Sequence, residues 1–310
     1  MDTKISTSQY FKMMNDLMTT QQGKIAELQS QLSAGKKNVT PSTDVKATTS
    51  SLKLTQVIST QEDDIRNLQS VHAGYKEEEA IMMSMVDMMR RMEDISVAAR
   101  SDTYNATDLD IFAIEVEGYM DDIRGLANSR DSNGHFMFSG TKVTTLPFTK
   151  QADGTVVYNG NQTEPKLELD TGYKLPVSIS GNKLAGVITR KNAIGAVTGR
   201  VDMFKVMLDF ATALKGNDRD GVELALSELR TVSSNLSKNL VDNGLRQDLV
   251  EQRREIGEDK IVIYKGLLSE ARDVDYATAV TQLSSDMLAL EAAQSTFAKV
   301  SQLSILNFIR

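Results

Sequence analysis

The stretch from Asp275 to Arg310 constrains the fold of this chain more than any other, because it contains neither glycine nor proline. Apolar side chains recur along it in steps of three and four residues, which predicts one α-helix with a single apolar stripe. The stripe consists of Val280, Leu283, Met287, Leu290, Phe297 and Val300. At about 1.5 Å per residue this helix would be roughly 54 Å long, and a narrow stripe of that length requires a partner helix.

The other end of the chain supplies a matching helix. Its apolar residues are also three and four apart, and they are Phe11, Met14, Met18, Ile25, Leu28 and Leu32. Gln21 fills one polar position in this series, Ser6-Thr7-Ser8 offers N-terminal caps, and Gly35 marks the end of the helix. We therefore predict that the N- and C-terminal helices pair as a coiled coil.

Between these ends the pattern changes from helical to β-rich and back. Helical periodicity covers about 45–100 and most of 201–271. Between these ranges a third helix is expected, with Thr107 as its N-terminal cap. Nine of the 19 glycines and three of the four prolines lie between Asp131 and Gly199. That region also carries a hairpin-turn signal at Asp153-Gly154 and a period-two run from Tyr173 to Ile179, which Pro176 restricts to an edge strand.

The predicted fold class is mainly α with an inserted β-rich domain. It is an elongated rod of long antiparallel helices, because the order of elements is symmetric about the insert. We predict three domains. Residues 1–40 with 272–310 form a terminal coiled-coil assembly domain, 41–134 with 200–271 a helical-bundle rod domain, and 135–199 an inserted β-rich outer domain.

The composition excludes several classes of function. The chain has no cysteine, which excludes thiol catalysis, disulfides and thiolate–metal sites. Its net charge of −7 argues against a nucleic-acid partner, and no apolar run approaches the length that spans a membrane. The start of the chain lacks the apolar region of a secretory signal, so we expect no cleaved signal peptide.

No catalytic, cofactor-binding or metal-binding constellation is recognisable, and we predict that the chain is not an enzyme. His72 and His135 are far apart and lie in no ligand-spaced motif. The carboxylate runs at 62–64 and 77–79 fan around their helix and are expected to form solvated faces. Gly181 and Gly186 have the spacing of a phosphate-binding loop, but Val187-Ile188 replaces the required Lys-Ser/Thr.

Six methionines between Met82 and Met92 have two interpretations. They fill a helix core with adaptable side chains, or they form a soft surface that accommodates non-identical neighbours. We favour the core, and the two interpretations overlap.

Several motifs resemble the flagellin-like family. Near the two ends these are Ser6-Thr7-Ser8-Gln9, Leu32-Ser33-Ala34-Gly35-Lys36-Lys37, Pro41-Ser42-Thr43-Asp44, Asp273-Val274-Asp275-Tyr276-Ala277 and Ser301-Gln302-Leu303-Ser304-Ile305-Leu306. In the middle they are Ala127-Asn128-Ser129, Gly134-His135-Phe136-Met137-Phe138-Ser139-Gly140-Thr141-Lys142, Pro147-Phe148 and Gly154-Thr155-Val156-Val157-Tyr158-Asn159-Gly160. This middle block resembles the hook-associated members of the family. The chain departs from the family at Val45-Lys46-Ala47, where a second acidic residue and a proline are usual, and it lacks the Arg-Ile and Asp-Asp-Ala-Ala-Gly signatures of filament flagellin.

The resemblance implies a structural subunit of the bacterial flagellum that joins hook to filament by axial self- and hetero-assembly. The residues of both terminal stripes would then form the assembly interface. The implied partners are a hook-side junction protein, flagellin, copies of the chain in a ring, and an export chaperone at the C-terminal helix. The implied location is extracellular, after export without a cleaved signal.

The sequence leaves three alternatives to this role. They are a filament flagellin, a coiled-coil adhesin, and a ligand-binding module that uses the β insert. An adhesin would need a membrane anchor or a sustained heptad array, and the sequence shows neither. A bound small molecule would identify the ligand-binding module.

Overall fold

The chain divides into two compact units, Met1–Gln61 with Asp259–Arg310 and Glu62–Glu258. A computed structural model describes residues 7–37, 44–101, 103–169, 172, 174–191 and 196–308, without the side chains of 7, 8 and 302–308. Ser6 and the side chains of Thr7 and Ser8, which were expected to cap the first helix, lie outside what is described. Two helices contribute to both units, α2 (Val45–Ala99) and α6 (Arg219–Arg272).

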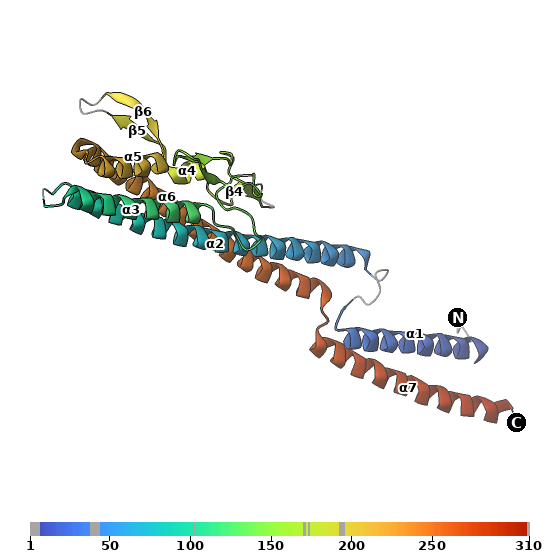
Figure 1. Cartoon of the computed structure of the whole chain (residues 1–310). Helices are drawn as coiled ribbons and strands as arrows, with labels where there is room; N and C mark the ends of the chain where they lie inside the picture. The colour runs from blue at the N-terminus through green and yellow to red at the C-terminus, as the bar shows by residue number, and fades with distance from the viewer. Residues whose placement is uncertain are drawn as a thin grey trace. The chain divides into compact units, whose positions relative to one another are not determined.

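The terminal helices of the first unit lie side by side and antiparallel, so their predicted pairing is confirmed (Figure 1). These are α1 (Thr7–Ala34) and α7 (Tyr276–Phe308). Where α1 ends, the N–H of Val274 donates to the carbonyl of Gly35 at 3.1 Å. Gly35 has a φ of 67°, which glycine adopts without strain, and Lys36 forms an antiparallel bridge with Asp273. The segment that follows α1 and the segment that precedes α7 are therefore bonded to each other, and this contact fixes where the helix pair begins.

The second unit packs four helices around one apolar core (Figure 1). They are α2, α3 (Ala106–Ala127), α5 (Met203–Lys215) and α6. The α2 and α6 chains run antiparallel, since the Ser96 hydroxyl donates to the Val222 carbonyl and the Asn243 amide reaches Glu78. Of the six methionines between Met82 and Met92, those fully buried in this core are Met82, Met85, Met89 and Met92. Most methionines of the run are therefore core residues, as the first interpretation predicted.

The N-terminal cap of α3 differs from the prediction. The cap is Asn105, whose side-chain oxygen accepts from the N–H groups of Thr107 and Asp108. Asp108 reaches back to the N–H of Asn105, which completes a reciprocal capping box. Thr107 was therefore the wrong residue, because the side chains of Asn105 and Asp108 together accept from three backbone N–H groups at the start of the helix.

In the residues that the structure describes, the β-rich region consists of three separate antiparallel hairpins and a short helix, not of one sheet. β1 (Phe148–Lys150) pairs with β2 (Val156–Tyr158), and β3 (Lys166–Glu168) with β4 (Lys174–Pro176). α4 (Gly181–Ala185) precedes the third pair, β5 (Ile188–Lys191) and β6 (Val197–Val201). The predicted turn at Asp153-Gly154 does join β1 to β2, and Gly154 has a φ of 85°. Pro176 ends β4, which pairs on one side only, as expected for an edge strand.

The apolar residues of the hairpin region pack against the helices. Phe138, Phe148, Ile179 and Leu184 belong to the same buried cluster as the methionines of α2. Leu169 and Leu175 join a second cluster with Tyr75 and Val250. A mainly α fold with a small β-containing region between long helices is thus confirmed. The domain boundaries predicted at 134 and 199 stay predictions.

Candidate assembly interface

The predicted stripes of α1 and α7 face each other within the first unit. Every predicted α1 residue, from Phe11 to Leu32, is at least partly buried, and Met14 is the most buried of them. On α7 the partly buried members are Leu283, Leu290, Phe297 and Val300. The rings of Phe11 and Phe297 meet edge to face, with centroids 5.3 Å apart. Aromatic pairs of this geometry stabilise a contact beyond the area they bury.

Two predicted residues of α7 do not face α1. Val280 is 50% exposed and Met287 is 53% exposed, whereas the preceding residues Ala279 and Asp286 are buried. The contact positions of α7 are 279, 283, 286, 290, 293, 297 and 300, which alternate steps of four and three as a coiled coil requires. At two places the prediction selected the larger apolar residue, Val280 or Met287, although the buried residue is the smaller or more polar one before it. A role for Val280 and Met287 in assembly with other subunits stays a prediction.

A polar pair lies in the middle of the apolar contact. The Gln21 side-chain amide donates to Oδ1 of Asp286 at 2.8 Å, and Gln282 donates to the same oxygen at 3.1 Å. Asp286 is only 9% exposed, so an out-of-register pairing would leave its carboxylate against apolar side chains. A single polar pair of this kind typically specifies the register of a coiled coil. The sequence showed the polar position of Gln21, and the three-and-four spacing around 286 was the signal for its partner.

Replacing both Gln21 and Asp286 with leucine is expected to keep or raise the stability of the helix pair while its register becomes heterogeneous. Apolar residues in place of a buried polar pair are often neutral or stabilising by about 1–4 kcal/mol. Because the natural chain has no cysteine, spin labels on Lys24→Cys and Ser285→Cys report the register directly. The parent should give one narrow distance distribution and the double leucine variant a broad one. An equally narrow distribution in both would show that the polar pair does not set the register.

The middle motif block serves to hold the hairpin region together. The Tyr158 hydroxyl lies 3.0 Å from the carbonyl of Phe138 and 2.8 Å from that of Asn161, and it accepts from the N–H of Gly181 at 3.3 Å. A Cβ at Gly181 would lie 2.4 Å from the Tyr158 ring and 2.7 Å from the Phe138 carbonyl oxygen, so only glycine fits. Gly140 is enclosed in the same way by Asn161. The motifs therefore specify close backbone packing.

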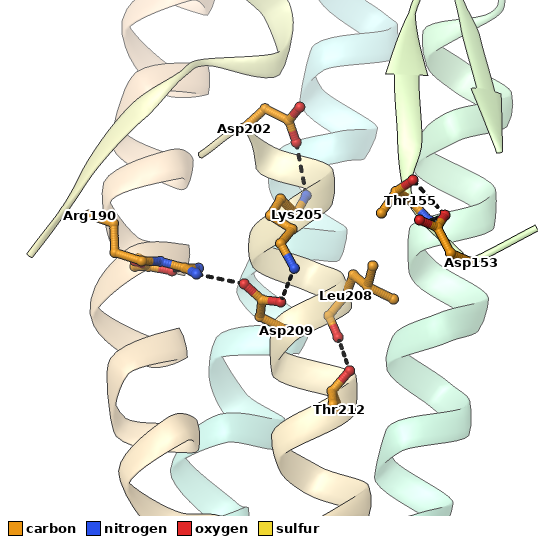
Figure 2. Close-up of polar contacts among 9 residues, drawn as sticks. Asp153, Thr155, Arg190, Asp202, Lys205, Leu208, Asp209 and Thr212 are labelled. Atoms are coloured by element: carbon orange, nitrogen blue, oxygen red, sulfur yellow. Dashed lines mark hydrogen bonds and ion pairs between the residues drawn. The ribbon is translucent and has the colours of Figure 1, made fainter. Parts of the chain in front are cut away.

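A partly buried ionic network connects the third hairpin to the helices (Figure 2). Arg190 of β5 makes two hydrogen bonds to Glu228 of α6, at 2.7 and 2.6 Å, and one to Asp209 of α5 at 2.7 Å. Lys205 donates to the other oxygen of Asp209 at 2.6 Å. The bonds from Glu228, with those of Asp209, hold the pKa of the Arg190 guanidinium above its ordinary value. A cavity of about 520 Å³ adjoins these residues, but they satisfy one another's charges.

The prediction of a solvated face at 77–79 is wrong for Glu78. Its neighbour Glu77 is exposed, but Glu78 is fully buried between α2 and α6. One carboxyl oxygen accepts from the N–H of Ile179 and the other from the Asn243 amide, both at 3.1 Å. The signal was the spacing 71, 75, 78, 82, 85, in which Glu78 occupies a core position of α2. Burial raises the pKa of the Glu78 carboxyl to about 8 from an ordinary 4.5, although Arg246 and the two hydrogen bonds oppose the rise.

This pKa predicts that the free energy of unfolding falls as the pH rises from 4.5 to 8. Within that window folded Glu78 retains a proton that the unfolded chain has released, so raising the pH favours the unfolded state. The limiting slope for one proton is about 1.4 kcal/mol per pH unit. Urea unfolding across this window should show a flatter dependence for Glu78→Gln than for the parent. Glu77→Gln is the matched control and should keep the parental slope; identical slopes in all three proteins would exclude Glu78 as the source.

Within the described part of the chain, no three His, Cys, Asp or Glu side chains lie close enough together to hold a metal ion. His135 lies 3.9 Å from Asp131 of its own turn, and His72 is on α2, remote in sequence from it. No helix in the described ranges is both long and apolar enough to cross a membrane.

Comparison with known proteins agrees with this architecture. Residues 5–143 match the bacterial flagellin N-terminal helical region. Flagellar hook-associated protein 3 of Salmonella typhimurium is 25% identical over 99% of this chain and 100% of its own length. The protein of the same name from Escherichia coli is 23% identical over 97% of this chain and 98% of its own length.

Solved structures share the fold. A flagellar hook-associated protein-3 from Legionella pneumophila is 15% identical, with a TM-score of 0.62 over 70% of this chain and 97% of that one. A putative flagellar hook-associated protein from Vibrio parahaemolyticus is 18% identical, with a TM-score of 0.64 over 74% of this chain and 100% of that one. Residues 5–143 are thus similar to the N-terminal helical region of bacterial flagellins, and the chain is similar over nearly its whole length to flagellar hook-associated protein 3, as its motifs predicted.

Proposed function

We propose that this chain is a structural subunit of the bacterial flagellum that joins the hook to the filament. The observation that carries the proposal is the similarity to two flagellar hook-associated proteins 3 over 99% and 97% of the chain. Another solved relative of the same fold is described as a flagellar junction protein. The role requires defined surfaces for axial assembly and no catalytic residue.

The helix pair of the first unit has the surface that such assembly needs. Besides the residues that pair α1 with α7, large apolar side chains remain exposed on the outside of both helices. They are Met13 and Leu17 of α1, and Val280, Met287 and Leu288 of α7. A groove of about 530 Å³ lies between Ile25, Met287 and Leu290. Exposed apolar surface of this kind typically marks a protein–protein interface, and neighbouring subunits would cover it.

The partners follow from the same proposal. Copies of the chain would surround one another in a ring, a hook-side junction protein would contact one end of the ring, and flagellin the other. Before export, a chaperone would cover the exposed apolar side of α7. The assembled chain would lie outside the cell, exported without a cleaved signal peptide.

Filament flagellin is the alternative that shares most of these features, since the matched N-terminal region is named after flagellin. Immunogold electron microscopy of isolated flagella distinguishes the two. A tagged copy should be confined to a short zone between hook and filament. Label along the whole filament would identify a filament subunit, and label absent from flagella would exclude both roles. In solution, the purified chain by itself should stay monomeric under conditions in which flagellin seeds grow, because a junction subunit meets different partners on its two sides.

A further inference from the structure

A polar cleft lies where the hairpin region meets α6, apart from the helix pair proposed for assembly. It has a volume of about 490 Å³, within the size range of small-molecule sites. Its walls come from the segment after β2, from α4 and the turn behind it, from β6, and from one face of α6. The lining residues that carry the argument are Ser180, Asn182, Arg200, Asn235 and Lys238.

Most of the polar side chains that line this cleft have no ion-pair or hydrogen-bond partner in the part of the chain that the structure describes. Arg200 and Lys238 make no ion pair with any residue the structure describes, and Asn182 and Asn235 make no side-chain hydrogen bond within the same part of the chain. Ser180 is only 5% exposed, yet its hydroxyl does not cap α4 and has no hydrogen-bond partner among the described side chains and backbone groups. The hydroxyl oxygen itself is not fully buried, so it is accessible from the cleft, where solvent or a ligand can form the missing hydrogen bond.

The cavity beside Arg190 differs from this cleft, because its charged side chains are already paired with one another. There the guanidinium, the two carboxylates and the Lys205 ammonium neutralise one another, so an incoming ligand would have to break existing ion pairs (Figure 2). In the cleft near Ser180, only Glu164 and Lys183 are paired, with Lys183 also 3.2 Å from Asp242. The unpaired charge that remains in the cleft lining is positive, on Arg200 and Lys238.

We propose that this cleft binds an acidic saccharide, a short chain of uronic-acid units. Arg200 and Lys238 would pair with the sugar carboxylate, since a guanidinium and an ammonium are the natural partners of that group. Side-chain amides both donate and accept, so Asn182 and Asn235 suit the neighbouring sugar hydroxyls, and the Ser180 hydroxyl suits another. This activity goes beyond the proposed junction role and does not depend on it.

Calorimetric titration of the full chain with digalacturonate at low ionic strength tests the proposal. We expect one saturable site. Arg200→Gln and Lys238→Gln should each weaken the affinity at least about tenfold, because each removes a charge-assisted hydrogen bond. Ser180→Ala should weaken it several-fold. Lys166→Gln removes an exposed lysine of β3 outside the cleft and should bind like the parent.

Melting temperatures that match the parent establish that each variant is folded. The proposal is overturned by absence of saturable binding, or by Lys238→Gln behaving like Lys166→Gln. Equal affinity for maltose would exclude recognition of the carboxylate. Equal affinity for inorganic phosphate would reduce the cleft to a general anion site and exclude recognition of the sugar.

Discussion

Replacing Leu290 with lysine is expected to separate α7 from α1 and to abolish swimming in cells that depend on this chain. Leu290 is partly buried at the centre of the contact, four residues beyond Asp286, and with Ile25 it lines the apolar groove of the helix pair. A lysine there must either bury its ammonium group without a partner or force the helices apart, and both cost several kcal/mol. Circular dichroism of the purified protein should show lost helicity, and soft-agar motility should be lost.

The matched control is Ala289→Lys, which adds the same charge at the adjacent, exposed position of α7. Its helicity should equal that of the parent. Secreted protein must be measured for both variants, because the proposed chaperone contact also involves α7. A Leu290→Lys protein with parental helicity that is secreted and supports normal swimming would remove this residue from the interface.

Replacing Phe148 with alanine should destabilise the second unit by about 3–5 kcal/mol, the usual cost of emptying a buried phenylalanine site. Phe148 is 1% exposed, and its ring centroid lies 5.1 Å from those of both Tyr158 and Phe204. It therefore connects the first hairpin to α5. At about 2–4 °C per kcal/mol, the melting temperature should fall by roughly 6–20 °C.

Val157→Ala is the control on the same hairpin. Val157 pairs with Thr149 on β1, and its side chain is 43% exposed, so the change should stay within about 0.5 kcal/mol. Equal melting temperatures for Phe148→Ala and the parent would mean that the hairpin does not share the core of the helices.

Periodicity by itself was sufficient to predict the helices of this chain and the pairing of its ends. The α1 stripe from Phe11 to Leu32 repeats every three and four residues, and only a helix brings such residues onto one face. The glycine-rich middle, with its turn at Asp153-Gly154, identified the hairpin region in the same local way. The family resemblance rested on contiguous motifs such as Gly154 to Gly160, which the structure explains by the tight packing around Tyr158.

Only the tertiary structure decided which residues face a partner. Ala279 and Asp286, not Val280 and Met287, contact α1, because the register of two helices depends on the partner's surface and on the pair with Gln21. Glu78 is buried and Glu77 is not, since α6 and the backbone at Ile179 cover one face of α2. The cleft beside Ser180 joins residues from Gln162 to Asn239, which no local pattern connects. Local sequence determines backbone periodicity, whereas burial and charge pairing depend on contacts between segments that are distant in the chain.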